Sequence, residues 1–82
     1  MAVVLLHPAV EQSLQSLPND IETRIREKLA DAGEDPERHL KPLKGRSEYS
    51  LRVGKRRAII DWDRADGELR VLDVDTRDTV YD

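Results

Sequence analysis

The spacing of apolar residues changes once along this 82-residue chain and divides it into a helical half and a strand half. In residues 8–33, apolar side chains recur every three or four positions, as on the buried face of an amphipathic helix. From residue 49 onward the pattern alternates, with Tyr49, Leu51 and Val53 set between polar residues, as in a half-buried strand. A helical segment followed by strands predicts an α+β fold, in which helices cover one face of a sheet.

Proline and glycine divide the first half into a strand and two helices. The short apolar run Val3–Leu6 predicts a strand, and Pro8 is well suited to the first turn of the helix that follows. Pro18 interrupts the helical pattern, so the segment predicts two helices joined as a hairpin. We expect the second helix to end at Gly33, because glycine is common just after a helix.

The second half predicts three strands joined by tight turns. Residues 54–55 (Gly-Lys) and 66–67 (Asp-Gly) have the composition of two-residue turns, and Asp-Gly is a strong hairpin signal. Residues 34–45 contain two prolines and a glycine and predict a connector. The expected order is β-α-α-β-β-β in one domain over residues 1–82: an N-terminal strand and helical hairpin packed on one face of a small twisted antiparallel sheet, with the other face open. The expected strands are 49–53, 57–62 and 69–74.

Composition argues against several classes of site. The chain has no cysteine, so disulfides and thiolate metal sites are not available to it. Its two histidines, His7 and His39, lie at no spacing typical of metal ligands, and no Gly-rich phosphate loop is present. We therefore expect neither a metal nor a cofactor. The apolar run at the N-terminus is too short to span a bilayer, and the expected location is the cytoplasm.

Charge is distributed along the chain in three blocks. Residues 1–40 hold eight acids and four bases, a net charge of −4, and residues 58–82 hold eight acids and three bases, a net charge of −5. Between them, residues 41–57 hold seven bases and one acid, a net charge of +6. The formal net charge of −3 argues against a general nucleic-acid binder, whereas the central block predicts a localised phosphate-binding surface.

The densest part of the basic block is the segment LRVGKRRAII, which begins at Leu51. If the chain turns at residues 54–55, Arg52 and Arg57 become close cross-strand neighbours on the polar face of a hairpin. Two facing cations are unfavourable unless an anion offsets them, and guanidinium groups bind phosphate bidentately. The segment therefore predicts a phosphate site. The alternative is ordinary surface ion pairing, of Arg52, Lys55 and Arg56 with Glu48, Asp61 or Asp73.

An ordered set of short motifs resembles the RelE/ParE superfamily of toxins from type II toxin–antitoxin modules. The resemblance covers nearly the whole chain and is specific through the order of its pieces. The family fold is a twisted antiparallel sheet with an N-terminal helical hairpin, which agrees with the element order given above. The motifs are Leu17-Pro18 between two helices, Pro36 followed by Leu43-Lys44-Gly45, the run Y-x-LRVG-x-x-R from Tyr49 to Arg57, and R-x-x-VY at Arg77 to Tyr81.

The resemblance implies a ribosome-dependent mRNA endoribonuclease, in which a ribose 2′-OH attacks the adjacent phosphate without a metal. Such a reaction requires a base, positive charge for the phosphorane, and an acid for the leaving oxygen. The family pattern assigns phosphate stabilisation to Arg57, with Arg52 on the strand before it. It adds Arg77 and Tyr81 as catalytic groups, since neighbouring guanidiniums favour a phenolate, and the ring would equally stack on a base. The implied RNA-binding residues are Lys44, Arg46, Lys55 and Arg56.

The sequence departs from the family pattern at several of these positions. Glu48 and Ser50 stand where RelE-type members often carry lysine, Thr76 stands where histidine is common, and Arg56 stands where an aromatic residue is frequent. These departures leave open two alternatives: a ParE-like inhibitor of DNA gyrase, and a degenerate toxin that only binds its antitoxin.

All three interpretations imply the same protein partner. This is a small cognate antitoxin, with an acidic or amphipathic segment that covers the basic face. The nuclease interpretation adds the ribosome and mRNA as partners, and none of the three involves a membrane.

Overall fold

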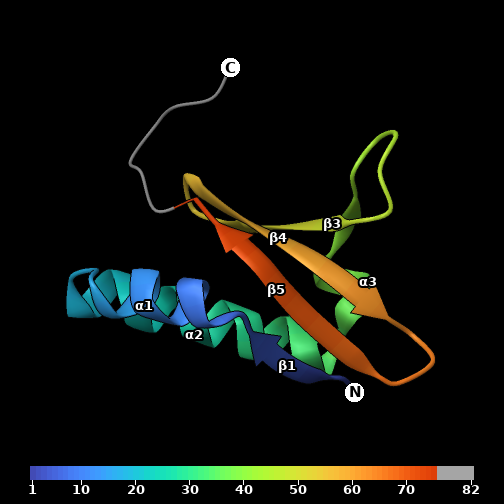
Figure 1. The fold of residues 1–82 in the computed structure, drawn as a ribbon, viewed down its shortest axis with the longest axis horizontal. Coiled ribbons are helices and arrows are strands. Elements are labelled where there is room, and N and C mark those ends of the chain that lie inside the picture. The colour runs from blue at the N-terminus through green and yellow to red at the C-terminus, as the bar shows by residue number, and fades with distance from the viewer. Residues whose placement is uncertain (76–82) are drawn as a thin grey trace.

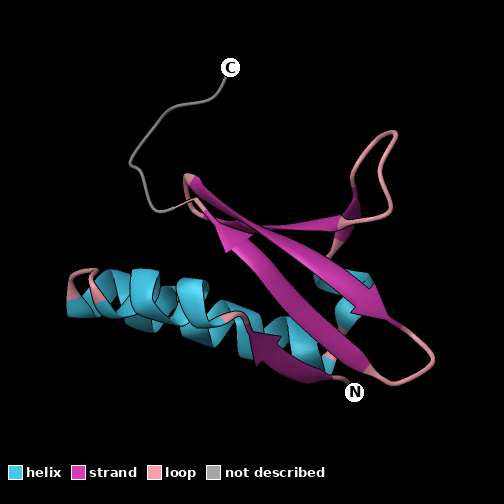
Figure 2. Cartoon of the chain, viewed as in Figure 1, coloured by secondary structure: helices cyan, strands magenta, loops and turns pink. Residues whose placement is uncertain are grey.

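The structure, a computed structural model, describes residues 1–75. In this part of the chain five strands form one sheet in the order β1-β5-β4-β3-β2, and the helices lie against one of its faces (Figures 1 and 2). The predicted α+β class and the helical hairpin are therefore confirmed. The elements are β1 (Val3–Leu6), α1 (Pro8–Gln15), α2 (Asn19–Glu34), α3 (Pro36–His39), β2 (Lys41–Pro42), β3 (Tyr49–Val53), β4 (Arg56–Asp63) and β5 (Glu68–Val74).

Two features of the fold differ from the sequence expectation. β1 pairs with β5 in parallel, whereas the other three strand pairs are antiparallel, as predicted for the whole sheet. Residues 34–45, expected to be a connector, contain the one-turn helix α3 and the two-residue strand β2. Both elements are shorter than any periodic pattern can reveal, since a period of two or of 3.6 needs several residues to become visible.

The core lies between the helices and the inner face of the sheet. Leu51, Ile60 and Leu69, from β3, β4 and β5, are fully buried, and they meet Leu14 of α1 and Ile25 of α2 in one cluster. Their neighbours along each strand point to the opposite face, as the alternation of a pleated strand requires. The open face of the sheet thus carries the predicted arginines and other polar side chains, together with the exposed apolar residues Val3, Leu5 and Leu72.

Arg26 holds the two helices of the hairpin together. Its guanidinium donates to both carboxylate oxygens of Glu11 on α1, at 3.1 and 2.8 Å, and to Glu22 one turn earlier on α2, at 2.9 Å. The hydrogen bond from Arg26 keeps the pKa of Glu11 below its ordinary value of 4.5. Folding therefore favours the ionised form of this carboxyl.

The Glu11–Arg26 pair predicts acid sensitivity. Because the pKa of Glu11 is lower in the folded protein than in the unfolded chain, its contribution to stability is present above pH 4.5 and is lost as the pH falls through the lower, folded value. In Glu11→Gln we expect a lower melting temperature at neutral pH and a smaller further decrease in acid. Melting curves between pH 7 and pH 2 test this, with Glu27→Gln, an exposed acid on α2, as the control. If the melting temperatures of Glu11→Gln and wild type differ by the same amount at every pH, the pair does not cause the acid sensitivity.

Gly33 was predicted to end the second helix, and this is wrong. It lies inside α2, which continues to Glu34, at the point where β1 comes closest to the helix. The amide of Ala2 donates to the carbonyl of Gly33 at 2.6 Å, and a Cβ added at Gly33 would stand 2.9 Å from the carbonyl oxygen of Ala2 and from a methyl of Val4. Glycine is required here by the close approach of the strand.

Gly33→Ala is accordingly expected to destabilise the protein. Alanine is favoured over glycine in a helix by about 1 kcal/mol, yet overpacking of a close contact costs about 1–3 kcal/mol. We expect the second effect to dominate, because one of the two atoms in the way is backbone. Urea denaturation measures the free energy of unfolding. As a control, Ala30→Gly on the same helix shows how much helix propensity alone changes this free energy. An increase in stability for Gly33→Ala would show that β1 can move away from α2.

Among the described residues, no helix combines the length and the apolar character needed to cross a bilayer.

Candidate phosphate-binding site on the β3–β4 hairpin

The predicted turn between the two basic strands is present and fixes their register. Gly54 and Lys55 connect Val53 of β3 to Arg56 of β4. Gly54 has a φ of +60°, and no non-glycine residue described has a positive φ. A positive φ at the first turn residue alone is the pattern of a type II′ turn, in which glycine is preferred at that position. The backbone therefore explains why glycine stands here.

The register brings Arg52 and Arg57 directly opposite each other, as predicted. Both side chains are exposed, and both lie on the face of the sheet that the helices leave open, because Leu51, Val53 and Ala58 beside them are buried. Two guanidinium groups held side by side on adjacent strands present a bidentate surface to a phosphate. The arrangement is suited to neutralise an anionic group that lies across the hairpin.

Two of the three alternative partners for these cations, Glu48 and Asp61, pair with other arginines. Glu48 accepts from Arg46 at 2.8 Å, and Asp61 accepts from Arg70 at 3.4 Å. Within residues 1–75, neither Arg52 nor Lys55 has an ion pair with a carboxylate. For these two side chains, ordinary surface ion pairing does not account for the position.

The predicted RNA-binding cations form two groups. Lys55 and Arg56 lie at the β3–β4 turn, where Arg56 is paired with the buried Val53 and so points to the helix side of the sheet, away from the arginine pair. Lys44 and Arg46 lie in the loop between β2 and β3, which projects at the other end of β3 (Figure 1). A five-residue strand is roughly 15 Å long, so one phosphate cannot contact both groups. An extended polyanion that follows β3 can.

The two remaining predicted catalytic residues, Arg77 and Tyr81, lie outside the described residues, as does Thr76. The last described residue, Asp75, lies next to the arginine pair, since its amide donates to the carbonyl of Arg57 at 2.9 Å. Their assignment as catalytic groups stays a prediction.

Sequence reasoning did not find the acidic cluster beside the β4–β5 turn, on the open face. Arg70 of β5 lies among four carboxylates of the β4–β5 hairpin, with Glu68 at 2.7 Å, Asp63 at 3.1 Å, Asp61 at 3.4 Å and Asp66 at 4.0 Å. A hydrogen bond from the backbone amide of Asp66, with help from Arg70, lowers the pKa of Asp63. Although each residue is visible in the sequence, only the register of β4 and β5 shows that they converge. The open face therefore has a basic end at the β3–β4 turn and an acidic end at the β4–β5 turn.

The aromatic residues near the site belong to the core side of the sheet. The rings of Tyr49 and Trp62 meet edge to face at 5.4 Å, and Arg64 stacks on Trp62 at 3.8 Å from the ring centre. Both rings pack against the buried cluster beneath the sheet. They are not positioned to stack on a base bound at the arginine pair.

Comparison with known proteins shows which structures the whole fold resembles. No family model and no curated protein matches the sequence. Solved structures do match. A chain of the RelBE2 toxin–antitoxin complex from Mycobacterium tuberculosis has a TM-score of 0.83 at 26% identity, over 93% of this chain and 98% of that one. A chain of the archaeal RelE–RelB complex from Pyrococcus horikoshii has a TM-score of 0.79 at 26% identity, over 96% and 98%.

A third match concerns a toxin without its partner. The isolated RelE toxin of Escherichia coli has a TM-score of 0.79 at 14% identity, over 96% of this chain and 87% of that one. The fold is therefore that of RelE toxins. This structural likeness confirms the resemblance to the RelE-like toxin superfamily that the motifs carry.

Proposed function

We propose that this chain is the toxin of a toxin–antitoxin module and that it cleaves mRNA on the ribosome. The observation that carries the proposal is the Arg52–Arg57 pair, held in register on the open face of a RelE fold. Several similar solved structures are complexes of a RelE toxin with its RelB antitoxin, which supports a protein partner of that kind here. The cytoplasm, where ribosomes and mRNA are found, is the location that this function requires.

The proposed chemistry is an attack of a ribose 2′-OH on the neighbouring phosphate. Negative charge grows on the phosphoryl oxygens as the phosphorane forms, and prearranged cations stabilise it. Arg57 would contact these oxygens, with Arg52 opposite it. Tyr81 would take part in proton transfer, with its phenolate favoured by guanidinium groups such as that of Arg77. Lys55 at the turn, with Lys44 and Arg46 at the far end of β3, would hold the RNA backbone on either side.

One observation favours a different target for the same fold. The acidic cluster around Arg70 lies on the same face as the arginine pair, and Glu48 pairs with Arg46 at the edge of that face. Carboxylates at these places repel a phosphate backbone that follows the sheet. A toxin that acts on a protein, such as a ParE-like inhibitor of DNA gyrase, would not meet this repulsion. A degenerate toxin that binds only its antitoxin is the remaining alternative.

Two assays separate these functions. In the first, a defined mRNA is translated in vitro with the purified protein, and primer extension maps the cuts. The proposal expects cuts at the codon in the ribosomal A site. In the second, the protein is added to DNA gyrase during supercoiling. Intact mRNA on ribosomes that bind the protein would overturn the nuclease proposal, and inhibition of supercoiling would replace it with the gyrase alternative.

A further inference from the structure

A pocket lies on the helix side of the β3–β4 turn, between the turn and α2. Its volume is about 320 Å³. It is separate from the open face that carries Arg52 and Arg57, although two of its residues adjoin that site. We call it the turn pocket. Its lining residues are Ile21, Arg24 and Ile25 from α2 with Val53, Gly54, Lys55 and Arg56 from the hairpin.

The turn pocket combines an aliphatic floor with a cationic rim. Ile25 and Val53 are buried members of the core, and Ile21 is half-buried beside them. Arg24 and Lys55 at the rim are exposed, and neither has an ion pair within the described residues. No acidic residue lines the pocket. A ligand that fits it carries both an apolar group and negative charge.

The residues that line the turn pocket indicate whether its ligand is an RNA or a peptide. Sequence-tolerant RNA sites stack bases on aromatic rings, and specific ones also present hydrogen-bond acceptors to base edges. The turn pocket offers no aromatic ring and no side-chain acceptor. Aliphatic side chains around a small hollow, with cations at the rim, are instead suited to a large apolar anchor flanked by carboxylates. The chemistry favours an acidic peptide.

We propose that the turn pocket binds an acidic segment of a protein partner, with one large apolar side chain against Ile21, Ile25 and Val53. Carboxylates on either side of that anchor contact Arg24 and Lys55. The inference rests on the antitoxin part of the proposed function and is independent of its nuclease part. Because Lys55 and Arg56 directly precede Arg57 in the chain, a segment bound in the pocket places negative charge behind the arginine pair.

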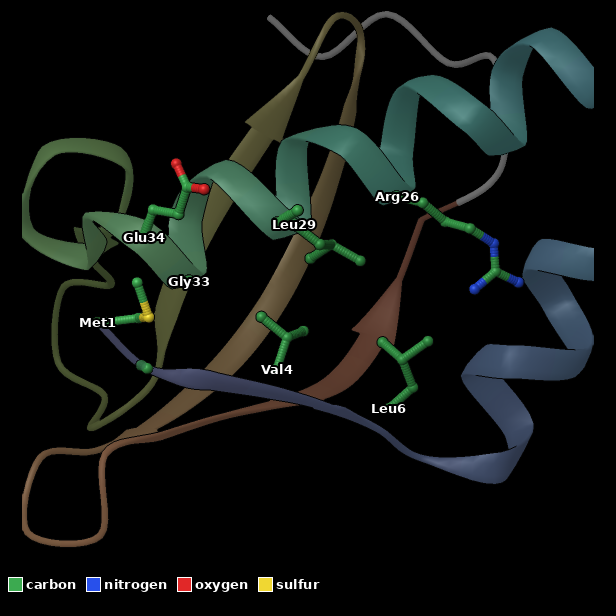
Figure 3. Close-up of a pocket in the computed structure, with 9 residues that line it drawn as sticks. Met1, Val4, Leu6, Arg26, Leu29, Gly33 and Glu34 are labelled. Carbon is green, nitrogen blue, oxygen red and sulfur yellow. The ribbon is translucent and has the colours of Figure 1, made fainter.

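A second hollow, between β1 and α2, does not support a comparable inference. Figure 3 shows its lining, in which Val4 and Leu6 of β1 face Leu29 of α2. The charged residues at its edge are Arg26 and Glu34, and Arg26 already pairs with Glu11 and Glu22. In the turn pocket, charge indicates the kind of ligand. In this hollow it does not.

Peptide binding to the full chain tests the inference. The probe is a fluorescein-labelled synthetic peptide of twelve residues that alternates pairs of glutamate and leucine, and the measurement is fluorescence anisotropy. We expect Arg24→Glu to weaken binding by about tenfold through charge reversal at the rim. Ile21→Ser is expected to weaken it by about tenfold through loss of apolar contact. Lys41→Glu, an equal charge change at an exposed residue of β2, should change affinity by less than about twofold.

The outcomes separate this site from general charge attraction and from RNA binding. Equal weakening by Lys41→Glu would overturn the inference, and so would wild-type affinity in both pocket variants with unchanged melting temperatures. Competition by a uridine decamer that disappears in Ile21→Ser would assign the pocket to RNA instead. Since the assay contains no ribosomes, a failure of the nuclease proposal would leave its result intact.

Discussion

Arg57→Ala is expected to lower the rate of mRNA cleavage on the ribosome by about 100-fold or more, with the fold intact. Removing one prearranged donor to a developing oxyanion typically costs about 100- to 1000-fold in rate. Arg57 is exposed and lies opposite Arg52, outside the buried core, so its removal leaves no cavity there. The loss should therefore appear in kcat and not in the melting temperature. Single-turnover cleavage of a defined mRNA on stalled ribosomes measures it.

Two further variants show whether the geometry or the charge of Arg57 is responsible for its effect on the cleavage rate. Arg57→Lys keeps the positive charge but loses the planar, bidentate guanidinium, so we expect it to recover only part of the rate. Arg38→Ala removes an exposed arginine from α3, away from the open face, and should change the rate by less than about twofold. Cleavage by Arg57→Ala at the wild-type rate would exclude this residue from the chemistry, whatever the true substrate is.

The arginine pair could be predicted because a two-residue turn determines which residues of the two strands lie opposite each other. Once residues 54–55 form a two-residue turn, Arg52 and Arg57 must be opposite each other, and the structure confirms this. Local pattern likewise identified the helical hairpin and the inner face of the sheet. These features depend on residues close together in the chain.

Features that depend on distant segments were not predictable in the same way. The parallel pairing of β1 with β5 joins residues 3–6 to residues 68–71, and no local pattern indicates that contact. Gly33 has the position of a helix terminator in the sequence, whereas its role depends on β1 passing against α2. Arg24 has the pattern of a solvated helix residue, and only its position over the β3–β4 turn makes it part of a pocket.

Gly54 is the residue on which the geometry of the arginine pair depends most directly. At a φ of +60°, a side chain with a branched Cβ is strained by about 1–3 kcal/mol. Since nothing lies within 4 Å of a Cβ added there, the strain is in the backbone and not in a steric contact. Gly54→Val should therefore lower the free energy of unfolding by that amount and lower the melting temperature by several degrees.

The effect of Gly54→Val on cleavage should exceed its effect on stability. To relieve the strain the turn must change type, and a different turn alters the twist or register of β3 against β4. Arg52 and Arg57 would then no longer be held side by side, and a displacement of about 1 Å at a reacting group can cost about 100-fold in rate. Gly54→Asn is the matched control, because asparagine tolerates a positive φ better than other residues with a side chain. If Gly54→Val and Gly54→Asn cleave equally well at a temperature where both are folded, the turn does not position the arginines for catalysis.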